Sequence, residues 1–205
     1  MTNPISSQLS GLLQFFKLTH TFQHIQRRLR VTGEDRFEND AEHSYQLALV
    51  AWYIIQKENL PLHMDKVFMY ALAHDLVEVY AGDTYAHDPD PAIHASKEER
   101  ERLAAERLRA DFAEFPELHE AIQGYEHLVD EESKLVYALD KVLPPTNIYL
   151  DGGKSWREMG VTREMIAKAK ADKVAVSPVI QKYWHLILTC IETEERELFG
   201  GESQS

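Results

Sequence analysis

Cysteine, long hydrophobic runs and a basic leader are all scarce or missing in this sequence of 205 residues. The single cysteine, Cys190, cannot form an internal disulfide or a cysteine zinc site, so we expect a reducing compartment. The longest apolar run, residues 47–55, is far shorter than the ~20 residues that cross a bilayer. Because the N-terminus lacks the positive lead of a secretory signal, we expect a cytoplasmic protein that has no membrane partner.

Positive charge is scarce as well, since 22 Lys and Arg residues face 34 Asp and Glu residues and give a net charge of -12. Nucleic-acid polymers and anionic membranes reward net positive charge, so neither is expected as the main partner. A local basic pocket for one small phosphate is still compatible with this balance. The length predicts one domain, which we place at residues 1–199, with a core at about 20–147, C-terminal helices at about 162–199 and a disordered tail at 200–205.

Apolar residues recur at spacings of three and four along most of the chain, and no segment alternates with the period of a strand. The sequence therefore predicts an all-α fold. We expect irregular segments at residues 30–40 and 146–162 and helices at residues 5–18, 41–57, 66–80, 97–112, 116–124 and 131–143, followed by a long helix that Pro178 begins.

The most informative segment runs from His74 to Asp83. On a helix His74 lies four residues before Glu78, and Asp75 lies three before it, so one face would present an imidazole and two carboxylates. Such a group is ordinarily an exposed polar face. Here the flanking residues are mostly apolar, which indicates a buried helix, and buried charges require partners or a metal.

Two further residues of suitable type lie in apolar segments elsewhere. His43 precedes the apolar run at 47–55, and Asp140 interrupts the apolar stretch at 135–143. Each alone would be read as a hydrogen-bonded core residue. Together with His74 and Asp75 they offer two imidazoles and two carboxylates from three predicted helices. This donor set suits one divalent first-row metal (Mn, Co, Fe or Zn) with open coordination positions.

The order His43, His74-Asp75, Asp140 resembles the H…HD…D signature of the HD-domain metal-dependent phosphohydrolases. Four short segments are similar to the YfbR-like 5′-deoxynucleotidase branch of that family. They are Arg-Phe-Glu-Asn at 36–39, Glu-His-Ser at 42–44, the Glu of His-Asp-Leu-Val-Glu at 74–78, and Gly-Asp at 82–83. The resemblance covers roughly residues 12–147. It implies an HD-domain helical bundle with a metal site between its central helices.

The resemblance also implies roles for individual residues. His43, His74, Asp75 and Asp140 would ligate the metal, one ion per site, and Glu78 would be the catalytic acid or base. The reaction would be hydrolysis of a nucleoside 5′-monophosphate to nucleoside and phosphate.

Recognition of the substrate is assigned by the same resemblance. Asp83 would orient substrate or water. An arginine upstream of the first histidine would contact the phosphate, and ungapped counting gives Arg28, with Arg27 as a competitor. Arg36 is a further candidate, because an arginine fork can hold phosphate through two hydrogen bonds.

Several features depart from the nucleotidase pattern and leave the base and sugar open. Leu29 stands where that branch has Trp, residues 84–89 differ, and residues 152–156 belong to an insert. A second metal is also left open, since histidines outside the signature could bind one, although each is ordinarily a surface residue: His87, His94, His119 and His127.

Two other classes of function compete with hydrolysis. A metal-containing helical module could bind a nucleotide without cleaving it, but it would not need Glu78 beside the phosphate. A helical interaction protein would hold no metal at all. The resemblance implies a homo-oligomer, in the simplest case a homodimer. The long helix that Pro178 begins has an apolar stripe, which we expect to pack in the core rather than to form an interface. The stripe consists of Ile180, Tyr183, Trp184 and Ile187.

Overall fold

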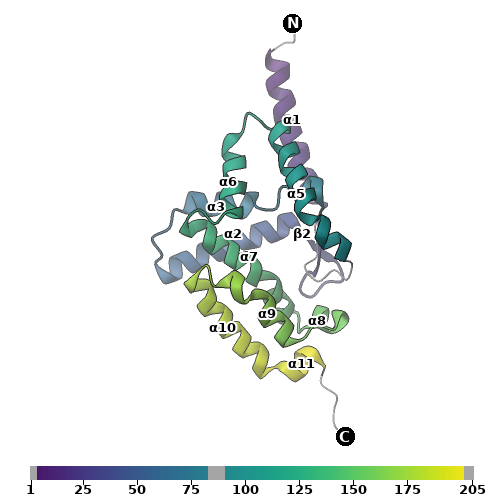
Figure 1. Cartoon of the computed structure of the whole chain (residues 1–205), viewed down its shortest axis with the longest axis vertical. Coiled ribbons are helices and arrows are strands. Elements are labelled where there is room, and N and C mark those ends of the chain that lie inside the picture. Colours follow the sequence, from purple (N-terminus) through teal and green to yellow (C-terminus); the bar gives the residue numbers. More distant parts are fainter. Residues whose placement is uncertain (1–3, 83–90, 201–205) are drawn as a thin grey trace.

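The structure, a computed structural model, describes residues 4–82 and 91–200, which form a helical bundle with a small β-hairpin (Figure 1). The all-α prediction is confirmed, and the hairpin is an addition to it. In chain order the elements are α1 (Pro4–Phe22), β1 (Gln26–Arg30), β2 (Phe37–Asn39), α2 (Asp40–Glu58), α3 (Met64–Ala73), α4 (Glu78–Ala81), α5 (Pro91–Asp111), α6 (Pro116–Glu126), α7 (Glu131–Leu150), α8 (Lys154–Met159), α9 (Arg163–Val174), α10 (Pro178–Thr193) and α11 (Glu195–Phe199).

Helix α7 is central, because α2, α3, α6, α9 and α10 all pack against it. Its apolar residues recur at helical spacing and are buried on several sides, as Val136, Leu139 and Leu143 illustrate. Leu47 and Ala51 of α2 are fully buried in the same core. Burial of such side chains is the main stabilising contribution to a bundle of this kind. Asp140 is thereby carried into the middle of the molecule.

The predicted end of this helix at residues 144–145 is wrong, since α7 continues through both prolines to Leu150. Two prolines remove two backbone donors from the helix and would normally end it. The last turn persists because it is tied to the core. Ile148 is buried, and the Asn147 and Gln46 side chains exchange two hydrogen bonds of 2.7 and 2.9 Å.

The predicted continuous helix at 66–80 is also wrong, because α3 ends at Ala73 and a tighter turn leads into α4. In a continuous helix the N–H of Asp75 would donate to the Ala71 carbonyl. Instead, His74 Nδ1 lies 3.0 Å from that carbonyl oxygen. Hydrogen bonds three residues apart then follow, such as Glu78 N–H to the Asp75 carbonyl at 2.9 Å. His74, Asp75 and Glu78 therefore lie on a turn rather than on one helical face.

The loop expected at residues 30–40 is wrong in part, because strands β1 and β2 pair there as an antiparallel hairpin. Its single apolar side chain facing the core, Leu29, carries too weak a pattern to predict a strand. The pairing places the arginines of β1 directly beside the start of α2. The hairpin is consequently part of the site described below.

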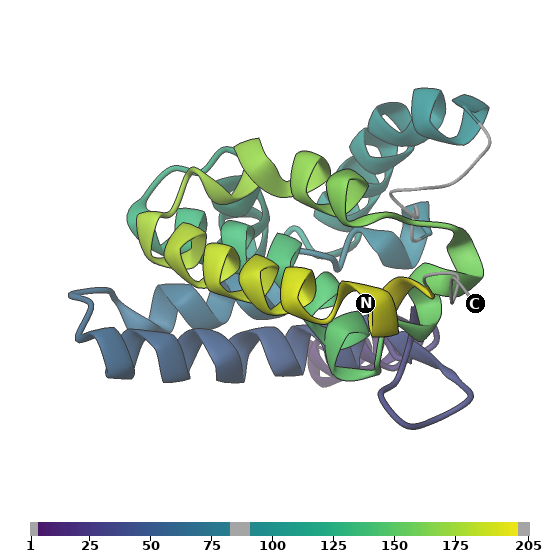
Figure 2. The ribbon, with the colours of Figure 1, turned by 90° about the horizontal axis from the view of Figure 1, so that it is seen from below.

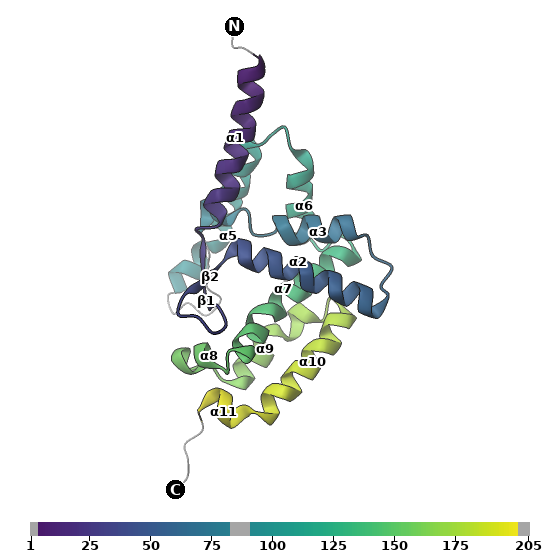
Figure 3. The same cartoon turned by 180° about the vertical axis from the view of Figure 1, so that it is seen from behind.

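Helix α1 is a helix as expected, but its predicted apolar face is not covered. Figures 1 and 3 show α1 projecting from the body of the molecule. Its C-terminal half packs against α4, and Phe15 contacts the Phe112 ring edge-on at 5.6 Å. Its N-terminal half leaves four side chains at least half exposed: Leu9, Leu12, Leu13 and Phe16.

The C-terminal helices form a layer against α7 (Figure 2). The irregular segment expected at 146–162 is wrong where α8 forms. The expectation that the α10 stripe serves the core is confirmed, since Ile180 and Trp184 are buried and Tyr183 and Ile187 pack against them. Residues 201–205 of the predicted tail lie outside the described residues. Among the helices of the described chain, none has the length and hydropathy needed to cross a membrane.

Candidate metal centre

A well-defined start of α2 positions its first histidine. Asn39 caps the helix by accepting a hydrogen bond from Glu42 N–H, while the Glu42 carboxylate accepts from Asn39 N–H. Arg36 donates two hydrogen bonds of 2.9 and 2.8 Å to that carboxylate. His43 follows in the first turn and is fully buried.

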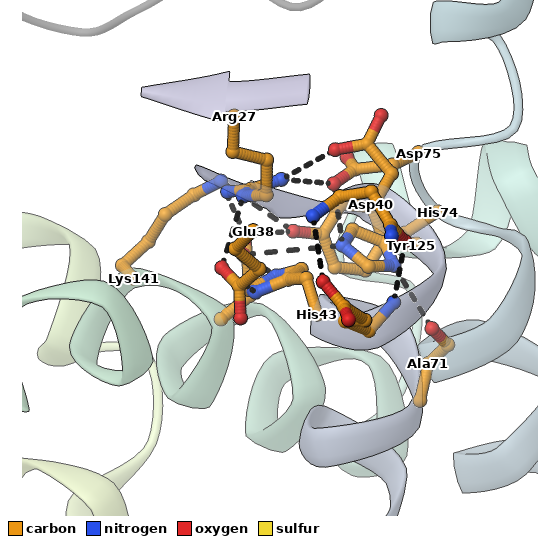
Figure 4. Close-up of polar contacts among 12 residues, drawn as sticks. Arg27, Glu38, Asp40, His43, Ala71, His74, Asp75, Tyr125 and Lys141 are labelled. Carbon is orange, nitrogen blue, oxygen red and sulfur yellow. Dashed lines mark hydrogen bonds and ion pairs between the residues drawn. The ribbon is translucent and has the colours of Figure 1, made fainter. Parts of the chain in front are cut away.

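The four residues predicted as metal ligands come together from three segments of the chain (Figure 4). His43 Nε2 lies 2.9 Å from Asp140 Oδ1, and His74 Nε2 lies 3.9 Å from the same oxygen. His74 Nε2 is also 3.0 Å from Asp75 Oδ2. Ligand atoms of His43, His74 and Asp75 all lie within 4.8 Å of one another. This spacing is suitable for one cation between His43, His74 and Asp75, and Asp140 lies beside both imidazoles.

The protonation of His74 tests whether a cation fits. A carbonyl oxygen only accepts hydrogen bonds, so the contact with Ala71 places the proton on Nδ1. The buried Nε2 then presents a lone pair toward the oxygens of Asp75 and Asp140, and within the described part of the chain it makes no hydrogen bond. A lone pair facing two carboxylates is unfavourable without a positive charge between them. The donor set therefore fits a divalent cation.

The electrostatics of the cluster concentrate negative charge around His74. Burial by itself lowers the pKa of His74, but Asp75 and Asp140 outweigh it and raise that pKa above its ordinary value. Burial by itself raises the pKa of Asp75 and of Asp140, but His74 and Arg27 hold the first below its usual range, and Lys141 and then His43 hold the second well below it. Both carboxylates therefore stay ionised in the interior, as metal ligands must be, and a bound cation would take the place of the proton that they favour on His74.

Three residues of this site were not identified as functional from the sequence. Tyr125 Oη donates a 2.6 Å hydrogen bond to Asp140 Oδ2 and orients the carboxylate. Asp40 is fully buried, and one of its oxygens groups with oxygens of Asp75 and Glu78 within 4.8 Å. Its position three residues before His43 is a signal that could have revealed it. Tyr125 had no such signal.

Glu38 is the third missed residue, and it lies behind His43. Its Oε2 is 4.0 Å from His43 Nδ1 and 3.7 Å from Arg27 Nε. Burial raises the pKa of Glu38 to about 7, although Arg27 opposes the shift. A carboxylate at this place can orient a ligating imidazole through its second nitrogen.

The three arginines considered for substrate binding lie in different places. Arg27 reaches the cluster, with one Nη 2.9 Å from Asp75 Oδ2 and 3.2 Å from Asp40 Oδ1. Arg28 lines the adjacent cavity. Arg36 instead lies at the surface, where Glu34 and Glu42 hold it.

Of the two predicted catalytic acids, Glu78 is described. It is 9% exposed and lines the cavity beside Asp75. Asp83 lies outside the described residues. The histidines considered for a second metal give no group here: His119 and His127 hydrogen-bond to backbone carbonyls, while the side chains of His87 and His94 lie outside the described part.

A cavity of about 310 Å³ opens beside this cluster. Its polar wall carries Arg27 and Lys141 next to the predicted ligands. Its other wall is mostly apolar and is built by α7, α8 and α9. Two lysines of α9, Lys170 and Lys173, also line the cavity, as do Glu101 and Glu126. The apolar lining residues are Pro144, Pro145, Ile148, Trp156, Met159, Val161 and Ile166.

Comparison with known proteins agrees with this geometry. The family model described as the HD domain matches residues 20–183, which is most of the chain. The chain belongs to the HD domain family. None of the curated proteins compared matches it.

Several solved structures are similar to this one. A predicted metal-dependent phosphohydrolase from Magnetospirillum magnetotacticum MS-1 is 29% identical with a TM-score of 0.81, covering 98% of this chain and 100% of its own. A conserved hypothetical protein from Pyrococcus furiosus (20% identity, TM-score 0.59, 88% and 99% covered) shares the fold. An HD-domain phosphohydrolase from Listeria innocua also shares the fold, with 18% identity, a TM-score of 0.53, and coverage of 90% of this chain and 99% of its own. The finer resemblance to the 5′-deoxynucleotidase branch stays a prediction.

Proposed function

We propose that this HD-domain protein is a metal-dependent phosphohydrolase that acts on a small phosphate monoester. The observation that carries the proposal is the buried His74 Nε2, which faces Asp75 and Asp140 and finds no hydrogen-bond partner among residues 4–82 and 91–200. A cavity large enough for a small molecule opens beside it. The similar protein from Magnetospirillum magnetotacticum, which bears the description of a metal-dependent phosphohydrolase, supports the same conclusion.

His43, His74, Asp75 and Asp140 would hold the cation. When bound, a divalent cation supplies neutralisation of phosphoryl charge and activation of water. Arg27 lies against Asp75 and would donate to the phosphoryl oxygens.

Glu78 would carry the proton transfer of the reaction. It lines the cavity within reach of Asp75 and is nearly buried. Its carboxylate would accept a proton from the attacking water, or as the acid protonate the leaving oxygen of the ester. The phosphorus–oxygen bond to the leaving group breaks, and the products are an alcohol and inorganic phosphate.

The substrate class that we propose is a nucleoside 5′-monophosphate. A cavity of about 310 Å³ with a charged end and an apolar wall matches a ligand that has a phosphate at one end and a flat apolar ring at the other. The resemblance of residues 36–44 and 74–83 to the 5′-deoxynucleotidase branch favours the same class.

Release of phosphate from a panel of ribo- and deoxyribonucleoside monophosphates, with Mn, Co, Fe or Zn added, tests this function. We expect turnover of at least one nucleotide that chelation abolishes and metal restores. Binding without turnover on the whole panel would favour the nucleotide-binding module instead. Absence of stoichiometric metal by elemental analysis would favour a plain interaction protein.

Arg27 is expected to hold the phosphate. Arg27→Ala should raise the KM for the best mononucleotide by at least ~10-fold with unchanged metal content, since a charge-assisted contact is lost. Arg28→Ala should have a smaller effect of the same sign, as Arg28 lines the same cavity, whereas Arg27 lies 2.9 Å from Asp75 Oδ2. Arg36→Ala is the matched control, because Arg36 pairs with surface glutamates. A KM within twofold of wild type for both cavity variants would show that the phosphate is held elsewhere.

We also propose that the protein forms a homo-oligomer through α1. Leu9, Leu12, Leu13 and Phe16 are each at least half exposed there. The helix contains no acidic residue, so two copies meet without the repulsion that a net charge of -12 imposes elsewhere. Sedimentation should show a dimer for wild type and Gln14→Glu and a monomer for Leu12→Glu. A monomeric wild type would contradict the proposal.

A further inference from the structure

The cavity has a second group of cations that the metal centre does not use. Lys170 and Lys173 lie three residues apart on α9, and both line the cavity. Helix α9 packs against α7, the helix that carries Asp140 and Lys141. Two segments far apart in the sequence therefore contribute cations to one cavity.

We infer that Lys170 and Lys173 form a second anion subsite, and that the substrate is a phosphate monoester bearing a second phosphate group. This inference rests on the proposed function, and it narrows the substrate from a nucleoside monophosphate to a bisphosphorylated nucleotide. The first phosphate is the one that is cleaved at the metal centre. The second is held by α9 and is retained in the product.

Lys170 is the residue whose charge most clearly favours a bound anion. It is partly buried, and among the described residues it makes no hydrogen bond or ion pair, whereas Lys141 lies 2.5 Å from Asp140 Oδ2. Burial, followed by Lys173 and Lys141, lowers the pKa of Lys170 to about 8. A lysine that faces other cations in a half-enclosed cavity is unfavourable until an anion binds between them.

The first phosphate does not account for this charge. The metal centre has cations of its own for a first phosphate, since Arg27 lies beside Asp75 and Lys141 beside Asp140. Lys170 lies on a different helix, α9, and has no such carboxylate partner among the described residues. A second phosphate bound at α9 offsets the repulsion between Lys170 and its cationic neighbours. The structure therefore favours two anionic groups on one ligand.

Calorimetry on metal-loaded protein tests the inference, in a Glu78→Gln background so that the probes are not consumed. The probes are adenosine 5′-monophosphate, adenosine 3′,5′-bisphosphate and adenosine 5′-diphosphate. We expect adenosine 3′,5′-bisphosphate, whose second phosphate stands on a separate ester, to bind at least 10-fold more tightly than the monophosphate, and adenosine 5′-diphosphate serves as the comparison with added charge on a single chain. Lys170→Met should remove that advantage and leave the monophosphate within twofold, while Lys170→Arg should keep at least half of the binding free-energy difference.

The matched control is Lys168→Met on the same helix, because Lys168 is exposed and does not line the cavity. Lys170→Met should melt at the same temperature as the control or higher, because it removes an unpaired charge. Equal affinity of wild type for all three probes would overturn the inference, and so would an equal loss for every probe in Lys170→Met. If the bisphosphate preference depends on Lys170 but the protein with Glu78 hydrolyses none of the probes, the subsite stands and the hydrolase proposal fails.

Discussion

Asp140→Asn is expected to lose bound metal and phosphatase activity together. Asp140 is the point at which the cluster converges: its Oδ1 lies 2.9 Å from His43 Nε2 and 3.9 Å from His74 Nε2. The substitution keeps the shape of the side chain but replaces the anionic donor with a neutral amide. Loss of an anionic ligand from a four-residue site should lower metal occupancy to below about a tenth of wild type at micromolar metal.

Elemental analysis and a phosphate-release assay on the same preparation measure both quantities. Glu131→Gln is the control, because Glu131 is an exposed residue in the first turn of the same helix. Circular dichroism establishes that the variant is folded, and His43→Ala provides a second test from a different helix. Full metal occupancy in both ligand variants would show that the cation is held by other residues.

Glu78→Gln is expected to keep the metal and lose at least ~100-fold in kcat, with KM changed by less than threefold. A positioned acid or base typically contributes 10²–10⁴-fold to turnover. Glu78 lines the cavity beside Asp75, yet it comes from α4 and is separate from the four predicted ligands. An amide retains the hydrogen-bonding shape but cannot exchange a proton, so binding should survive while the chemical step fails.

The outcome of this variant also distinguishes two roles. Glu78 shares an oxygen cluster with Asp40 and Asp75, within 4.8 Å, that could itself bind a cation. Loss of metal in Glu78→Gln would make Glu78 a ligand rather than the acid or base. Wild-type turnover would remove it from the mechanism. Glu120→Gln, an exposed position on α6, controls for the loss of one negative charge.

The sequence by itself determined which residues form the candidate metal centre. His43, His74, Asp75 and Asp140 are ionisable residues inside apolar helical patterns, and the cost of burying an isolated charge makes that combination informative. Helical periodicity also predicted the all-α class, because the spacing of apolar residues depends on local geometry. These features require no knowledge of which segments meet.

Tertiary contacts alone decided which residues surround that centre. α7 runs through Pro144 and Pro145 because Asn147 is tied to Gln46 on another helix, a contact between positions 101 residues apart. A prediction from local sequence accounts for the two backbone donors that the prolines lack, but it does not include the hydrogen bonds to a distant residue.

Tertiary contacts also decide which arginine reaches the metal centre and which lysine lines the cavity. The sequence around Arg27 and Arg36 does not show which of them reaches the site, but pairing of β1 with β2 directs Arg27 to Asp75 and leaves Arg36 with Glu42 at the surface. Lys170 is one of several lysines in a charged helix until α9 packs against α7 and turns it toward the cavity. Long-range packing, which periodicity does not encode, therefore decided the lining of the pocket.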